Sequence, residues 1–250
     1  MRCYGLIGFP LSHSFSEKYF AEKFVREGIT DCSYRNYPIE HIGKFREWIS
    51  MHPELEGLNV TIPYKEKILD FLDELDHVAE GVGAVNTIKV LRPGGKVVLK
   101  GFNTDAYGFR TSLIPFLKPA HKKALILGTG GASKAVVYVL KSLGIDTTYI
   151  SRTGVDEKRL SYAQLTGEVV ANASIIVNTS PVGMYPHIHE CPDIPYEFLT
   201  PSHILYDLIY NPAQTRFLIN GRIKGAFTVN GLQMLYLQAE KSWEIWNSVP

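Results

Sequence analysis

Residues 124–133 read ALILGTGGAS, and they predict the fold of the second half of the chain. The apolar run Ala124 to Leu127 predicts a buried strand, and apolar residues at helical spacing follow the glycines from Ala135 to Leu140. A strand, a glycine turn and a helix in this order are typical of a dinucleotide-binding fold. The glycines let the backbone approach a pyrophosphate, and the helix N-terminus stabilises its charge. Ser133 stands where a third glycine is usual, so a purely structural strand-to-helix connection is the alternative interpretation.

The next predicted strand, Thr147 to Ile150, leads into Ser151, Arg152 and Thr153. An NAD-preferring site usually places a carboxylate here to bind the ribose diol, and this chain has none at that position. Arg152 can pair with a 2′-phosphate, and the flanking hydroxyls can donate hydrogen bonds to the same group. The sequence therefore favours NADP. NAD stays the alternative cofactor because residues 154–157, GVDE, add no further basic side chain, and a solvated loop arginine is the plainer interpretation of Arg152.

Composition excludes several classes of protein. Hydrophobic residues make up 45% of the 250 residues and charged residues 20%, as in ordinary globular proteins. A formal charge of +1 provides no global field for nucleic acid or an anionic membrane. Three cysteines without a CxxC pair indicate neither a disulfide framework nor a thiolate zinc site. We find no signal-peptide pattern and no apolar run of about 18 residues, so we expect a cytoplasmic protein that does not enter membranes.

Strand and helix patterns alternate along the whole chain, which predicts an α/β fold in two units. Residues 1–103 are expected to form a mainly parallel α/β unit, and residues 104–230 a Rossmann-like dinucleotide-binding unit. An amphipathic helix within 231–250 carries Trp243 and Trp246 near one face, and we expect it to return to the first unit and pack its core.

Polar motifs follow several predicted elements of the first unit. Residues 59–65 read NVTIPYK, residues 83–87 read GAVNT, and residues 101–105 read GFNTD. Polar groups at the carboxyl ends of strands usually face a ligand crevice in α/β sheets. Taken singly, Asp105 could cap the helix that it opens and Lys65 could be an ordinary surface lysine.

Together these motifs resemble the shikimate dehydrogenase family almost from end to end. The resemblance is carried by GFPLSHSFS (8–16), NVTIPYK (59–65), GAVNT (83–87), GFNTDAYGF (101–109), ILGTGGASKAV (126–136), SRT (151–153), NTSPVGM (178–184), YDLIYNP (206–212) and NGLQMLYLQA (230–239). It implies an N-terminal substrate domain, a dinucleotide domain after it, and a final helix returning to the first. It further implies NADPH-dependent, reversible reduction of 3-dehydroshikimate to shikimate in chorismate and aromatic amino acid biosynthesis.

The same resemblance implies roles for individual residues. Lys65 and Asp105 would be the catalytic pair, because an ammonium can protonate the oxygen of a carbonyl that receives a hydride. The substrate carboxylate and ring hydroxyls would be bound by Ser14, Ser16, Asn59, Thr61, Asn86, Asp105, Tyr210 and Gln238. The cofactor would be bound by Gly128, Thr129, Gly130, Gly131, Ala132, Ser151, Arg152, Thr153, Leu208, Gly231 and Met234.

Two rival functions stay open at this stage, and so does the oligomeric state, monomer or homodimer. The chain could be a quinate and shikimate dehydrogenase with mixed cofactor use, or a non-catalytic sensor that retains both ligand folds. Retention of Lys65 and Asp105 argues against the sensor. The run His187, His189 and Cys191 lies in a Pro-containing loop, and we expect no metal there. His13, beside the predicted substrate serines, could contact a ligand or stabilise a turn.

Overall fold

The computed structural model describes residues 1–11, 15–154 and 158–248. Its contacts divide the chain into two compact units, Met1–Thr104 with Gln238–Pro250, and Asp105–Leu237. The boundaries fall after Thr104 and before Gln238, so the first residues of the C-terminal helix belong to the second unit, whereas the predicted division places residues 231–250 with the first. Ser14 and His13 lie outside the described residues.

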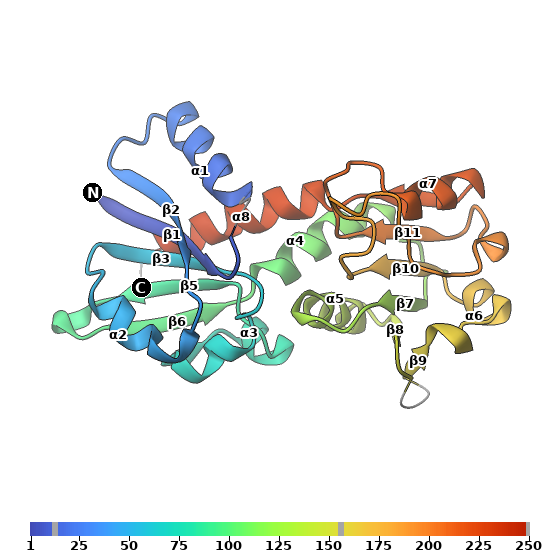
Figure 1. The fold of residues 1–250 in the computed structure, drawn as a ribbon, viewed down its shortest axis with the longest axis horizontal. Helices are drawn as coiled ribbons and strands as arrows, with labels where there is room; N and C mark the ends of the chain where they lie inside the picture. Colours follow the sequence, from blue (N-terminus) through green and yellow to red (C-terminus); the bar gives the residue numbers. More distant parts are fainter. Residues whose placement is uncertain (12–14, 155–157, 249–250) are drawn as a thin grey trace. The chain divides into compact units, whose positions relative to one another are not determined.

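The first unit is built on a six-stranded mixed sheet of order β2-β1-β3-β5-β6-β4 (Figure 1). Three of its five strand pairings are parallel, and the β5–β6 hairpin supplies the antiparallel ones. Its strands are β1 (Arg2–Gly8), β2 (Cys32–Pro38), β3 (Leu55–Val60), β4 (Glu74–Leu75), β5 (Thr87–Leu91) and β6 (Val98–Phe102). Its helices are α1 (Phe15–Arg26), α2 (Phe45–Ser50), α3 (His77–Val82) and the part of α8 (Leu232–Asn247) from Gln238 on, with 3-10 turns at Ile42–Lys44, Lys67–Phe71 and Pro93–Gly95.

Alternating side chains of β1 divide the core of this unit between the two faces of the sheet. Tyr4 packs with α1 and α8, and its ring stacks on that of Trp246 at 4.9 Å between centroids. Ile7, on the other face, packs with Phe45 and Ile68. An added Cβ at Gly57 would lie 2.3 Å from the Trp246 ring, so α8 sits directly on the backbone of β3. The prediction that the tryptophans of the last helix pack a core is confirmed.

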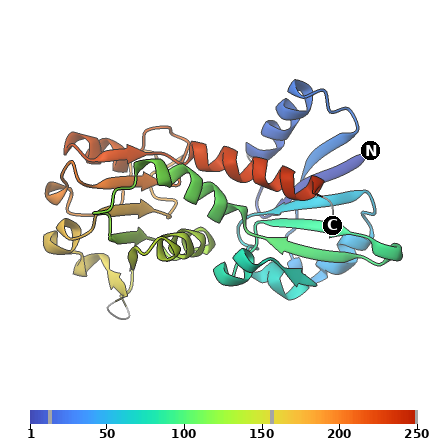
Figure 2. The same cartoon turned by 180° about the vertical axis from the view of Figure 1, so that it is seen from behind.

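The second unit contains a six-stranded sheet of order β12-β11-β10-β7-β8-β9, in which every pairing is parallel (Figure 2). Its strands are β7 (Lys123–Leu127), β8 (Asp146–Ser151), β9 (Arg159–Ser161), β10 (Ile175–Asn178), β11 (Ile204–Asp207) and β12 (Phe227–Val229). Its helices are α4 (Thr104–Leu113, in this unit from Asp105), α5 (Gly131–Ser142), α6 (Gly167–Ala171), α7 (Arg216–Ile223) and the start of α8, with 3-10 turns at Ile114–Phe116, Tyr162–Gln164 and Tyr196–Phe198. Counted within the unit, this is the doubly wound order 3-2-1-4-5-6.

Neighbouring residues of β11 show how this sheet is covered on both faces. Leu205 packs against α7, where an added Cβ at Gly221 would lie 2.4 Å from its side chain. Tyr206 points to the opposite face, where its ring meets Phe109 of α4 at 5.0 Å and its hydroxyl lies 2.7 Å from Ser112 Oγ. Strands buried on both faces explain the continuous apolar runs that predicted them. Among the described helices, none is both long and apolar enough to cross a bilayer.

Candidate active site

The carboxyl ends of β3 and β6 and the amino end of β5 meet at one edge of the first sheet. The antiparallel register places Asn59 opposite Thr87, and Thr87 opposite Phe102. The three polar motifs of the first unit, at 59–65, 83–87 and 101–105, therefore come together at this edge. The resemblance groups these motifs, and the strand pairing explains physically why they lie together.

Asn86 is the centre of a buried polar network at this edge, with a side chain only 3% exposed. Its Oδ1 accepts a hydrogen bond of 2.7 Å from the backbone N–H of Thr104, which opens α4. Its Nδ2 donates to Thr104 Oγ1 at 3.0 Å and to Gln238 Oε1 at 3.4 Å. The structure thus joins two of the predicted substrate residues, Asn86 and Gln238.

Lys65 is held near this network by its backbone. Its carbonyl accepts a hydrogen bond of 2.7 Å from the N–H of Val85, the residue before Asn86. The preceding residue, Tyr64, is buried, and its hydroxyl donates to the carbonyls of Ile39 and Glu40. Lys65 and Thr104 are therefore bonded to two consecutive residues, and Asp105 directly follows Thr104. Asp105 lies within the first turn of α4 rather than at its cap.

Both ends of the Asn59 side-chain amide are hydrogen-bonded to other groups of the protein. Its Oδ1 accepts from the Tyr34 hydroxyl at 2.8 Å. Its Nδ2 lies 3.3 Å from the Asn86 carbonyl, 3.2 Å from Thr87 Oγ1 and 3.0 Å from Ser242 Oγ. Burial raises the pKa of Tyr34, and a hydrogen bond with Ser16 partly offsets that rise. Ser16, near the start of α1, is thereby linked to Asn59 through Tyr34.

The remaining predicted substrate residues are placed separately. Thr61 is half-buried and its N–H donates to the Ile7 carbonyl at 2.9 Å, which fixes the turn after β3. Tyr210 belongs to the second unit, where burial raises the pKa of its phenol.

The glycine turn of the second unit lies at the switch point of the sheet, between β7 and β10. Gly128 has a φ of +108°, which favours glycine, and its N–H donates to the Ile150 carbonyl at 2.9 Å. Thr179, after β10, donates from its hydroxyl to the Leu127 carbonyl at 2.9 Å. Ligands of open α/β sheets bind in the crevice at such a point, so the predicted location of the dinucleotide agrees with the topology.

Helix α5 begins at Gly131, with Gly130 at its N-cap position. An added Cβ at Gly130 would meet no atom within 4 Å, so the backbone there is open to a ligand, and Thr129 beside it is exposed. The first N–H groups of a helix lack intrahelical acceptors and attract anions. Ser133, in place of the third glycine, is fully buried, and its hydroxyl donates back to the Gly130 carbonyl at 2.6 Å. The turn therefore accommodates the departure from the usual pattern.

Ser151, Arg152 and Thr153 follow β8, whose Ile150 is bonded to Gly128. The Ser151 hydroxyl donates to the Thr153 carbonyl at 2.5 Å, which folds the turn back on itself. Arg152 is exposed, as a guanidinium that binds a ligand from solvent must be.

Leu208 and Gly231, both predicted near the cofactor, touch through their backbones. An added Cβ at Gly231 would lie 2.0 Å from the Leu208 carbonyl oxygen. Met234, one turn further along α8, is buried. Beside Leu208, the fully buried Asp207 accepts hydrogen bonds from Thr215 Oγ1 at 2.6 Å and Asn178 Nδ2 at 3.1 Å. Burial raises the pKa of Asp207 to about 6.

Sequence reasoning missed several members of these networks. Thr87 and Thr104 stood in quoted motifs without a role, and Ser242 stood in none. Its position four residues after Gln238, on the same face of a helix, is the one signal that could have found it.

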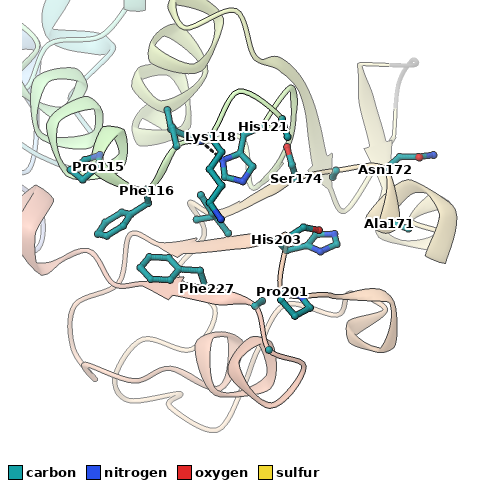
Figure 3. A pocket seen from close by; sticks show the side chains of 17 residues that line it. Pro115, Phe116, Lys118, His121, Ala171, Asn172, Ser174, Pro201, His203 and Phe227 are labelled. Carbon is teal, nitrogen blue, oxygen red and sulfur yellow. Dashed lines mark hydrogen bonds between the residues drawn. The ribbon is translucent and has the colours of Figure 1, made fainter.

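A separate cavity of about 790 Å³ lies in the second unit at the amino ends of β7, β10, β11 and β12 (Figure 3). Its two histidines are engaged by backbone groups: Nδ1 of His121 accepts from the Lys118 N–H, and Nδ1 of His203 accepts from the Thr200 N–H, both at 3.0 Å. None of the predicted site residues lines it, and it lies at the edge of the sheet opposite the glycine turn. Within the described ranges no three His, Cys, Asp or Glu side chains are grouped to hold a metal, the 187–191 run included.

Fold and site define a class of protein, in which a doubly wound dinucleotide-binding unit is joined to a second α/β unit that carries a buried polar network. The model of the shikimate dehydrogenase substrate binding domain matches residues 6–88. Together with the relatives described next, this match shows that the chain belongs to the shikimate dehydrogenase family.

Curated relatives resemble the chain over nearly its whole length. The shikimate dehydrogenase (NADP(+)) of Desulforamulus reducens is 34% identical, and the alignment covers 97% of this chain and 88% of the relative. The enzyme of the same name from Carboxydothermus hydrogenoformans is 36% identical, with 98% and 91% covered.

Solved structures agree with both units of the fold. Shikimate 5-dehydrogenase from Thermus thermophilus, in complex with NADP(H) and shikimate, has a TM-score of 0.84 at 30% identity and covers 100% of this chain and 94% of its own. Quinate dehydrogenase from Corynebacterium glutamicum, in complex with NAD, has a TM-score of 0.85 at 26% identity and covers 99% and 94%.

Proposed function

We propose that this chain catalyses the reversible, NADP-dependent interconversion of 3-dehydroshikimate and shikimate in chorismate biosynthesis. The observation that carries the proposal is the bonding of Lys65 and Thr104 to the consecutive residues Val85 and Asn86. This bonding fixes the backbone of the proposed proton donor and that of the residue before Asp105 within one buried network. Most of the proposed substrate residues belong to the first unit, and all the proposed NADP residues belong to the second.

The second unit fits a dinucleotide by its own geometry. The open backbone at Gly130 and the free start of α5 would hold the pyrophosphate, with Gly128, Gly131 and Ala132 completing the turn. Arg152 would pair with the 2′-phosphate beside Ser151 and Thr153. When bound, the cofactor supplies the hydride in the reducing direction and accepts it in the oxidising direction.

Lys65 and Asp105 are the proposed catalytic pair. As the ring carbonyl becomes an alkoxide, the Lys65 ammonium stabilises the charge on oxygen and donates the proton. The Asp105 carboxylate accepts hydrogen bonds from the ammonium and from a ring hydroxyl, which orients both. In the oxidising direction, neutral Lys65 accepts the hydroxyl proton.

A polyhydroxylated carboxylic acid suits the polar side chains offered for it. Ser14 and Ser16 bind the carboxylate, while the hydroxyls of Thr61 and Tyr210 and the amides of Asn59, Asn86 and Gln238 address the ring hydroxyls. A site built to bond hydroxyls discriminates strongly against substrates that lack them, because its buried polar groups would then be unpaired.

The direct test follows reduced-cofactor absorbance with purified protein and shikimate, using NADP⁺ and NAD⁺ in parallel. We expect turnover with shikimate and a higher kcat/KM with NADP⁺. Absence of turnover with both cofactors would overturn the proposal in favour of a non-catalytic binding protein.

A quinate-oxidising activity is the second candidate. It is favoured by the likeness to the quinate dehydrogenase from Corynebacterium glutamicum and by the lack of a second basic residue directly after Arg152. Repeating the assay with quinate separates the two, since a kcat/KM for quinate equal to that for shikimate would establish the mixed enzyme.

A further inference from the structure

Ser242 is the least expected member of the buried network. It lies on α8, one turn after Gln238, and its side chain is fully buried. Its Oγ lies 2.8 Å from Thr87 Oγ1, 3.0 Å from Asn59 Nδ2, 3.2 Å from Thr104 Oγ1 and 2.9 Å from the Gln238 carbonyl. Four polar partners around one hydroxyl exceed what a helical serine needs to bury itself.

The donor and the acceptor can be assigned in the hydrogen bonds around Ser242. A carbonyl only accepts and an amide nitrogen only donates, so the Ser242 proton goes to Gln238 and one lone pair receives the Asn59 amide. The second lone pair accepts from a threonine hydroxyl, with Thr87 nearer than Thr104. Ser242 therefore fixes which way these hydroxyls point.

These hydroxyls in turn lead to the Asn86 side chain. Thr104 Oγ1 accepts from Asn86 Nδ2 at 3.0 Å and lies 3.3 Å from Thr87 Oγ1, so the network runs from Ser242 through Thr87 and Thr104 to Asn86. An asparagine amide has a donor end and an acceptor end, so its orientation decides which groups it offers to a ligand. Ser242 is thereby connected to Asn86, whose Nδ2 donates to Gln238 Oε1.

We propose that Ser242 is a positioning residue, whose hydroxyl orients Asn86 and Gln238 for the substrate through Thr87, Thr104 and Asn59. The inference rests on the proposed function, because it assigns Asn86 and Gln238 to the substrate. Satisfied supporting networks of this kind hold binding groups in their productive geometry.

The test compares Ser242→Ala with Ser112→Ala. Ser112 is also a buried helical serine, 5% exposed, and its Oγ bonds the carbonyls of Gly108 and Phe109 and the Tyr206 hydroxyl, outside this network. We expect Ser242→Ala to lower kcat/KM for shikimate about tenfold while KM for NADP⁺ is unchanged. Ser112→Ala should change neither, although both variants lose comparable stability.

A double-mutant cycle separates positioning from simple destabilisation. Combining Ser242→Ala with Asn86→Ala should give a loss in kcat/KM smaller than the product of the single losses, whereas Ser112→Ala with Asn86→Ala should be multiplicative. Multiplicative losses for both pairs, or equal kcat/KM for Ser242→Ala and wild type, would overturn the inference.

Failure of this inference and failure of the proposed function give different results. If Ser242→Ala does not fold, Ser242→Cys replaces it, and full wild-type kcat/KM in that variant overturns the inference. A wild type inactive on shikimate overturns the proposed function and this inference with it.

Discussion

Substituting Gly231 by alanine should separate two backbone segments on which the proposed cofactor site depends. The new Cβ would lie 2.0 Å from the Leu208 carbonyl oxygen, whereas ordinary contacts begin at 3.4 Å. The obstacle is backbone, and both segments are anchored, because Gly231 N–H donates to Ile209 at 3.1 Å and Leu208 N–H donates to Asn178 at 3.0 Å.

Overpacking that moves a backbone costs about 1–3 kcal/mol in the free energy of unfolding. The φ of Gly231 is outside the left-handed region, so steric crowding alone carries the cost. Gly43→Ala is the matched control, since its Cβ would meet no atom within 4 Å. The same substitution at both positions cancels the change in unfolded-chain entropy.

The assay is urea unfolding followed by far-ultraviolet circular dichroism. Tryptophan fluorescence would report unfolding of the first unit and not of the second, which contains Gly231, because Trp48, Trp243 and Trp246 all lie in the first. We expect Gly231→Ala to be less stable than Gly43→Ala by about 1–3 kcal/mol and to bind NADP⁺ more weakly. Stabilities within about 0.5 kcal/mol of each other would refute the packing argument.

Three further predictions concern charge. Burial raises the pKa of Asp207 from 3.8 to about 6, so the folded protein favours the protonated carboxyl group. The contribution of Asp207 to the free energy of unfolding therefore falls by up to about 3 kcal/mol as the pH rises from about 4 to above 6. The difference in unfolding free energy between wild type and Asp207→Asn should therefore shrink from pH 3.5 to pH 7, and a constant difference would contradict this assignment. Burial lowers the pKa of His121, whose Nδ1 accepts from the Lys118 N–H, so its contribution to stability is complete above pH 6.5 and is lost as the pH falls through the pKa of the folded protein. In urea unfolding, the free energies of wild type and His121→Gln should therefore converge in acid, and a difference that persists there would contradict this prediction. Arg152→Ala should raise KM for NADP⁺ about tenfold and leave KM for NAD⁺ unchanged, in steady-state kinetics with shikimate; an equal rise for both cofactors would remove the 2′-phosphate assignment.

The second unit could be predicted largely from local pattern. The apolar run Ile204 to Tyr206 predicts a strand over residues 204–207, and β11 has these bounds, because a parallel strand buried on both faces is rich in consecutive apolar residues. The glycine turn was recognisable because φ at Gly128 is a local requirement. β9, only three residues long and half polar, was missed, since its pairing with β8 gives it strand conformation. The pattern of residues 65–72 predicts a short helix, but the structure has a 3-10 turn at Lys67–Phe71, after Pro63 and after Lys65, whose carbonyl is hydrogen-bonded to Val85.

The site was less accessible from sequence. The motifs around Asn86 and Lys65 were recognised by resemblance, but their meeting depends on strand register. Ser242 was not recognised, because its contact with Thr87 joins residues 155 positions apart and its spacing from Gln238 is the only signal that the sequence carries for it. Asn59 is proposed to address the substrate, and both ends of its amide also have protein partners.

In the proposed mechanism Lys65 supplies and removes the proton at the reacting oxygen. The decisive measurement is kcat of Lys65→Ala at saturating shikimate and NADP⁺, with NADP⁺ affinity measured by titration. We predict a fall in kcat of at least about a hundredfold with cofactor affinity unchanged. A variant that retains kcat within a few-fold of wild type would contradict the account.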